Sequence, residues 1–232
     1  MKGRKTNMAG PNPEVEVIWG GGGWHRSHRR YMRPYVEGAV DLATEAVQSL
    51  GIRYSHPKRA SIRRCGNSYP AVGENQDQTG FRLFIRNDDY RRHKAAVRFG
   101  TYATASAHEL THAARHERFG NWDLLEEIAS EGIAHVAEDL VTQDLGMVED
   151  YLYMEIVNAM AVDHQAAKRA LVMDYEAYGN DDSVIDNWFD WDSPYIDRGV
   201  VLGIAEVQKR LVEGHAIGEI IDWPPERVLD LS

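Results

Sequence analysis

Hydrophobic residues recur with strand-like and helix-like spacing in the first hundred residues. Between Pro34 and Gly51 they stand three or four positions apart, which predicts an amphipathic helix that begins at Pro34 and ends before Gly51. The segment 66–80 is rich in Gly, Asn and Gln and is predicted to be a loop. Alternating or β-rich stretches predict four short strands, at 15–19, 52–56, 60–64 and 81–86.

The pattern after residue 100 is mainly helical. Long helices are predicted at about 102–118 and 122–144, with Gly120 in the break between them. The acidic and aromatic segment 179–192 is predicted to be an irregular lid, in preference to a Ca²⁺-binding loop. Further helices are predicted within 151–178 and at 199–212, 217–221 and 227–231. The predicted fold class is α+β, with a small N-terminal sheet and a helix followed by a mainly helical lobe.

The chain of 232 residues is expected to form a single domain, 14–232, after a flexible tail at 1–13. Residues 14–100 would form the sheet-containing lobe and residues 101–232 the helical lobe. No apolar run is long enough to span a membrane or to serve as a signal peptide, so a cytoplasmic protein is expected. The single cysteine, Cys65, cannot form an internal disulfide, which agrees with that compartment.

Charge is distributed unevenly along the chain. Residues 1–100 carry 18 Lys and Arg against 9 Asp and Glu, although the net charge of the whole chain is −10. The basic half could attract the acidic half of the same molecule, or it could contact nucleic acid or an acidic protein. The first interpretation is favoured because no nucleic-acid-binding motif accompanies the charge. A solvated surface is the expected setting of the arginines at 26, 29, 30 and 33.

The strongest chemical signal is the sequence His108-Glu109-Leu110-Thr111-His112, which has the form H-E-x-x-H. On a helix the two histidines lie on one face, separated by about 6 Å along the axis. That spacing lets two imidazole nitrogens converge on one Zn²⁺. Glu109 would reach a water molecule near the ion without binding the ion itself, which is the position of a general base.

A third ligand must come from elsewhere in the chain. Arg115 and Arg118 occupy the positions at which metzincins carry a glycine and a third histidine, so that class is excluded. His116 lies about 12 Å along the helix axis from His108, too far for the two to share one ion. The remaining option is a carboxylate from the following helix.

Glu131 is the preferred carboxylate. It shares one stripe of the helix predicted at 122–144 with Leu124, Ile128 and His135. An ionisable group in a largely apolar stripe costs free energy unless something pairs with it, and a metal ion would do so. His135 is expected to contact the metal ligands and orient them, without binding the metal itself. The alternatives to Glu131 are Glu126, Glu127 and Glu138.

The H-E-L-T-H sequence and the downstream segment 129–134, A-S-E-G-I-A, resemble a bacterial family of predicted Zn-dependent proteases carried as a domain of unknown function. That family pairs HExxH with S-E-G-[LI]-A in the gluzincin manner. The likeness extends over about 34–230 and includes Trp223-Pro224-Pro225 near the C-terminus. The resemblance implies a zincin-like metallopeptidase fold, with His108, His112 and Glu131 as ligands and Glu109 as base. Relatives often carry a carboxylate four residues after the ligand glutamate, where this chain has His135.

The expected function is therefore zinc-dependent hydrolysis of peptide bonds by an activated water, with a peptide or protein as substrate. Tyr195 is the predicted donor to the developing oxyanion, and strand 81–86 either pairs with extended substrate or is an ordinary member of the sheet. The alternative is a zinc-containing binding or regulatory protein that contacts nucleic acid or an acidic protein through its basic N-terminal half. Contact with nucleic acid is the less favoured reading, no membrane partner is expected, and no oligomeric state is predicted.

Overall fold

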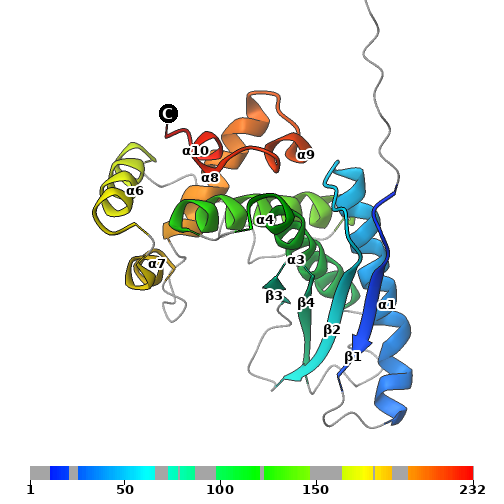
Figure 1. The fold of residues 1–232 in the computed structure, drawn as a ribbon. Coiled ribbons are helices and arrows are strands. Elements are labelled where there is room, and N and C mark those ends of the chain that lie inside the picture. The colour runs from blue at the N-terminus through cyan, green and yellow to red at the C-terminus, as the bar shows by residue number, and fades with distance from the viewer. Residues whose placement is uncertain are drawn as a thin grey trace, which may run out of the picture.

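The computed structural model describes nine stretches of the chain, namely residues 11–20, 26–65, 73–77, 79–86, 98–120, 123–146, 164–179, 181–189 and 198–231. Within these residues the protein is a mixed α+β structure, with the strands in the N-terminal part and helices throughout (Figure 1). The predicted fold class is confirmed at this level.

Four strands form one sheet in the order β1-β2-β4-β3. Its strands are β1 (Val15–Trp19), β2 (Lys58–Cys65), β3 (Gly73–Asp77) and β4 (Gly80–Arg86). The first three in that order run parallel, and β3 pairs antiparallel with β4. The interior position of β4 excludes it from pairing with a substrate, because both its edges already bind a neighbouring strand. The prediction of a loop over the whole of 66–80 was wrong, since β3 lies within it.

The segment 52–56 is not a strand, in contrast to the prediction. The backbone N–H of Ile52 bonds to the carbonyl of Val47 at the end of the preceding helix. The N–H groups of Ser55 and His56 donate to the carboxylate of Glu117, at 2.6 and 3.2 Å. These donors are satisfied by a helix that begins far along the chain, so the segment needs no sheet partner.

Helix α1 (Arg26–Ser49) begins eight residues before the predicted start and contains Pro34 within it. Its apolar stripe continues back to Met32, which is fully buried, and Arg33 pairs with Glu37 one turn on at 2.7 Å. These contacts outweigh the single helical hydrogen bond that a proline removes. Helix α1 packs against β1 and against α3 (Phe99–Phe119).

Helix α3 contacts β3 and β4 on one side and α4 (Leu124–Asp144) on another (Figure 1). Helix α4 in turn crosses α8 (Arg198–Val212) at backbone contact. A Cβ placed on Gly132 of α4 would lie 2.2 Å from the backbone carbon of Gly203 in α8. Only glycine lets the two backbones come this close, so the crossing fixes the position of α4, and of its side chains, relative to α8. The predicted spans of all three helices are confirmed to within three residues.

The remaining helices are short or peripheral. They are α6 (His164–Tyr178), α7 (Asp182–Trp188), α9 (Ile217–Ile220) and α10 (Pro225–Val228). Helix α7 corrects the predicted irregular lid: the Asp181 side chain accepts from Ser183 N–H, and the buried Trp188 donates to Asp174 at 2.9 Å. The last helix ends at Val228, so the predicted end at residue 231 was wrong; Asp230 has a φ of 57°, which an α-helix does not contain. No helix among the described residues is long and apolar enough to cross a membrane.

Candidate metal centre

Two neighbouring helices bring the three predicted ligands together. The Nε2 atoms of His108 and His112 on α3 lie 3.0 Å apart. From α4, the carboxylate of Glu131 faces both of them, with Oε1 at 3.3 Å from His112 Nε2 and Oε2 at 3.6 Å from His108 Nε2. The two histidines are one turn apart on the same face, which is what their spacing requires.

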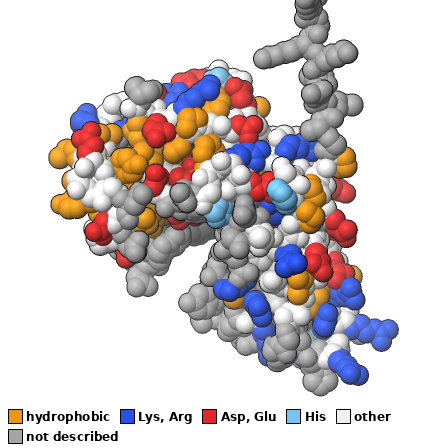
Figure 2. Space-filling view, viewed as in Figure 1, with side chains coloured by type: hydrophobic (Ala, Val, Ile, Leu, Met, Phe, Trp, Pro, Cys, Tyr) orange, Lys and Arg blue, Asp and Glu red, His pale blue; other side chains and the backbone are white. Residues whose placement is uncertain are grey.

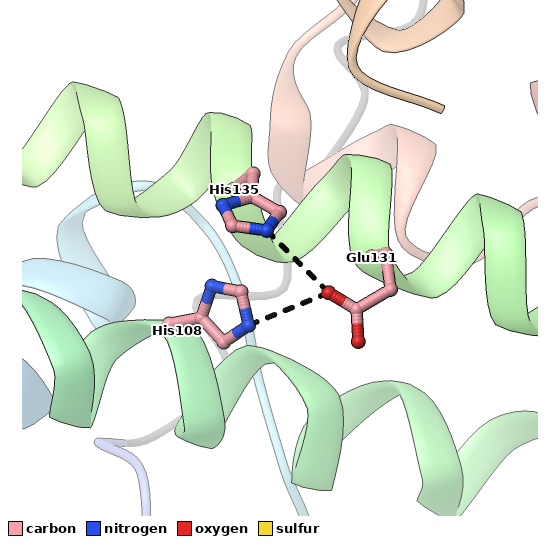
Figure 3. A group of neighbouring side chains, drawn as sticks. All are labelled: His108, Glu131 and His135. Carbon is pink, nitrogen blue, oxygen red and sulfur yellow. Dashed lines mark ion pairs between the residues drawn. The ribbon is translucent and has the colours of Figure 1, made fainter. Parts of the chain in front are cut away.

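His135 joins this group directly. Its Nε2 atom lies 3.6 Å from Glu131 Oε2, and its ring meets the ring of His108 edge to face, with 4.6 Å between centroids (Figure 3). Ligand atoms of His108, Glu131 and His135 all lie within 4.8 Å of one another. From the sequence, His135 was predicted to orient the site without binding the metal. In the structure its Nε2 atom faces the same Glu131 carboxylate as the Nε2 atoms of His108 and His112.

The outer nitrogens of the imidazoles contact other polar side chains. Glu138 Oε2 lies 3.1 Å from His108 Nδ1 and 3.6 Å from His135 Nδ1, the second separation being slightly longer than a hydrogen bond. Ser130 Oγ lies 2.8 Å from His112 Nδ1. A carboxylate beside Nδ1 holds the proton of a neutral imidazole there and leaves the Nε2 lone pair facing the site.

Glu138 was predicted as an alternative metal ligand, but in the structure it lies behind His108, on the side away from Glu131 Oε2. Ser130, the partner of His112, is buried. The helical spacing of α4 could have indicated this role for Glu138. Positions 131, 135 and 138 share one face of the helix, so Glu138 can contact the outer nitrogen of a histidine whose inner nitrogen faces Glu131.

The electrostatics of the cluster favour added positive charge. Burial opposes the charged form of His108, but the carboxylates of Glu138, Glu131 and Glu109 outweigh it and raise its pKa to about 10. Burial likewise opposes ionised Glu131, but the three histidines hold its pKa at about 2. The pKa of His112 is lowered, chiefly by burial. Ionised carboxylates surrounding neutral imidazoles form a strong cation site once the proton on His108 leaves.

Glu109 stands next to His108 in α3 and is only 5% exposed. Its negative charge contributes to the raised pKa of His108, which places it within electrostatic reach of the centre. One turn before Glu131, the half-buried Glu127 has its pKa raised to about 8 by burial and by the charges of Glu131 and Glu126. The region around Glu131 is therefore both buried and rich in carboxyl groups.

The donor set fits a divalent transition metal. Two ligands at about 2.1 Å from a tetrahedral ion lie about 3.4 Å apart. The separations of 3.0, 3.3 and 3.6 Å among His108, His112 and Glu131 bracket that value. Imidazole and carboxylate ligands suit zinc and its neighbours in the first transition row, and the outer partners at Nδ1 are those that metal-binding histidines have.

Other predicted residues are not part of this group. Tyr195 lies within 190–197, outside the described residues, so its predicted role stays a prediction. His116 continues the row of His108 and His112 along α3, one turn beyond His112. The group whose ligand atoms all lie within 4.8 Å of one another is His108, Glu131 and His135, and His112 adjoins it through His108 Nε2 and Glu131 Oε1. No family model matches the sequence, and the comparisons with curated proteins and with solved structures also found no match.

Proposed function

We propose that this chain is a zinc-dependent metallopeptidase of the gluzincin kind, with His108, His112 and Glu131 holding the ion and Glu109 as the general base. The observation that carries the proposal is the convergence of two Nε2 atoms from α3 and a buried carboxylate from α4 within 3.0–3.6 Å. A zincin-like arrangement of the helical lobe is part of the same proposal. It agrees with the resemblance of the HExxH and S-E-G-I-A segments.

Each residue has a stated task. When bound, Zn²⁺ supplies Lewis acidity and lowers the pKa of a water to about 7. The Glu109 carboxylate takes a proton from the attacking water and returns it to the nitrogen of the leaving amine. Glu138 and Ser130 hold the rings of His108 and His112 with Nε2 inward. The burial of Glu109 and Glu131 limits competing water at the centre.

The sheet offers a place for an extended substrate. Strand β3 lies at the edge, and among the described strands it pairs only with β4. It also contacts α3, the helix that carries His108 and Glu109. We therefore assign the role of pairing with substrate backbone to β3 in place of β4, by addition of one antiparallel or parallel strand.

Glu109→Gln tests the proposal. The variant keeps the shape of the side chain but cannot accept a proton, so it should retain zinc and lose peptide hydrolysis by about 10²–10⁴-fold. Glu176→Gln, the same change on an exposed turn of α6, is the matched control and should leave the rate unchanged. Zinc content and cleavage of a broad peptide library are measured for all three proteins. Equal rates for wild type and Glu109→Gln would contradict the proposal.

A second candidate function rests on the basic surface. Lys and Arg side chains gather at the lower right of the molecule, around the N-terminal half of α1 (Figure 2). Arg26, Arg29 and Arg30 are exposed there. A binding protein that contacts nucleic acid through this surface should retain DNA or RNA in a salt-dependent manner. Absence of retention at low ionic strength eliminates this candidate.

A further inference from the structure

We propose that His135 is a fourth protein ligand, so that the centre consists of three imidazoles and one carboxylate. The inference rests on the proposed function in taking the same metal centre, but it does not require that the centre hydrolyse peptides. It assigns to His135 a direct bond to the ion in place of the orienting role expected from the sequence.

The His135 ring is oriented like that of His108. His135 Nε2 faces Glu131 Oε2 at 3.6 Å, and His108 Nε2 faces the same oxygen at the same distance. Both rings turn Nδ1 toward Glu138 Oε2 on the far side. The Glu131 carboxylate thus lies on the Nε2 side of both rings, and the Glu138 carboxylate lies on their Nδ1 side. His135 is oriented as a metal-binding histidine is, with Nε2 toward Glu131 and a carboxylate beside Nδ1.

The separation of His135 from Glu131 also favours a shared ion. A histidine that merely donated a hydrogen bond to Glu131 would bring nitrogen and oxygen to about 2.7–3.2 Å. The observed 3.6 Å is too long for that bond. It is close to the distance of about 3.4 Å between two ligands of one tetrahedral ion. The gap between His135 and Glu131 is the gap that a shared cation requires.

Helix α4 holds His135 in this position. Glu131, His135 and Glu138 are spaced by four and three residues on α4, so all three emerge from one face. Helix α4 is fixed by its contact with α8 at Gly132, immediately after Glu131. The side chain of His135 is only 14% exposed. Its place at the centre is therefore set by rigid backbone and not by a mobile loop.

A fourth protein ligand changes what the centre does at rest. Structural zinc sites have four protein ligands, whereas catalytic sites keep one position for water or substrate. With His135 bound, a tetrahedral Zn²⁺ has no such position. The inference thus describes a latent centre, in which hydrolysis requires His135 to leave or the coordination number to rise to five.

The ligands can be counted in the full-length protein after loading with Co²⁺. In ¹H NMR spectra recorded in H₂O, each imidazole bound through Nε2 contributes one strongly shifted, exchangeable Nδ1–H signal. Wild type should show three such signals, His135→Gln two, and the control His116→Gln three. The affinity for Co²⁺ should fall by roughly 100-fold in His135→Gln, at least the loss caused by removing an outer partner.

Two signals in wild type, unchanged in His135→Gln, would overturn the inference. Should His135→Gln not fold, the wild-type count decides by itself, since three signals support the fourth ligand and two exclude it. Two signals in an active peptidase refute this inference alone. Three signals in wild type, with no peptide hydrolysis by wild type or by a folded, metal-loaded His135→Gln, refute the proposed function alone, and the absence of shifted signals at saturating Co²⁺ refutes both.

Discussion

His108 Nδ1 lies 3.1 Å from Glu138 Oε2, so the first histidine of the HExxH sequence is held from behind by a carboxylate on the next helix. Glu138→Gln keeps the shape of that side chain and removes its charge. We predict that it weakens zinc binding by 10–100-fold, because a neutral amide oxygen is a weaker acceptor for His108 Nδ1–H than a carboxylate, and the negative charge behind the ring is lost. The dissociation constant is measured by competition with a chromophoric chelator.

The matched control is Asp139→Asn, the next residue of α4, whose carboxylate accepts from Gln143 at 2.7 Å. This change removes the same charge one position away and should leave zinc affinity within about twofold, because it alters only a screened, longer-range interaction. If both variants bind zinc as tightly as wild type, Glu138 has no part in holding the centre.

The crossing of α4 and α8 should tolerate no side chain. A Cβ on Gly203 would lie 2.2 Å from the carbonyl oxygen of Ile128, so Gly203→Ala must push the helices apart. We predict a loss of about 3 kcal/mol in the free energy of unfolding. Gly38→Ala is the control, since its Cβ would meet only Phe99 at 3.5 Å and gains up to about 1 kcal/mol of helix propensity. Urea denaturation distinguishes the two, and equal stability of both variants would refute the account of this crossing.

Arg115 anchors α3 to the C-terminal segment. Fully buried, it makes two 2.6 Å hydrogen bonds to Glu126 and donates to the carbonyls of Ile221 and Trp223. Arg115→Met leaves these acceptors buried without their donor and should cost about 3–5 kcal/mol. The exposed pair Arg33–Glu37 supplies the contrast, because Arg33→Met should cost less than about 1 kcal/mol. Thermal unfolding of both variants at one pH tests the difference.

Glu127 makes the metal-free protein less stable at alkaline pH. Its pKa rises from 4.5 to about 8 on folding, so the folded chain holds a proton that the unfolded chain releases. The stability contributed by this proton is fully present below pH 4.5 and is lost as the pH rises through 8. Glu127→Gln removes this loss. The free energy of unfolding of the variant, relative to that of wild type, should therefore be higher at pH 9 than at pH 5 by on the order of 2 kcal/mol.

Unfolding is followed in the presence of a chelator at both pH values. Glu176→Gln, on the exposed face of α6, should show the pH profile of wild type. A Glu127→Gln profile that falls as steeply as that of wild type between pH 5 and 9 would refute the assignment.

The sequence predicted the site best where the residues lie on one helix, because their spacing along the chain then fixes which face they share. The four-residue interval of His108 and His112 and the apolar stripe around Glu131 were sufficient to bring together atoms that lie within 3.6 Å in the structure. The direction of the His135 ring could not be read in the same way, because it depends on how far α4 is turned relative to α3. That rotation is set by the contact of Gly132 with Gly203, across a long interval of sequence.

The errors in secondary structure have a similar cause. Residues 52–56 have strand-like composition, but Glu117 satisfies the backbone donors of Ser55 and His56 across about sixty residues of chain. The acidic composition of 179–192 suggested a loop, whereas burial of Trp188 and capping by Asp181 stabilise a short helix. In both cases tertiary contacts outweigh the local preference of the sequence.

The most direct test of the account is a crystal of the full-length protein soaked in zinc, with anomalous differences recorded on both sides of the zinc absorption edge. The account predicts one strong peak within about 2.0–2.2 Å of His108 Nε2, His112 Nε2 and a Glu131 carboxylate oxygen. A peak bound elsewhere, or no peak between α3 and α4 at saturating zinc, would contradict it.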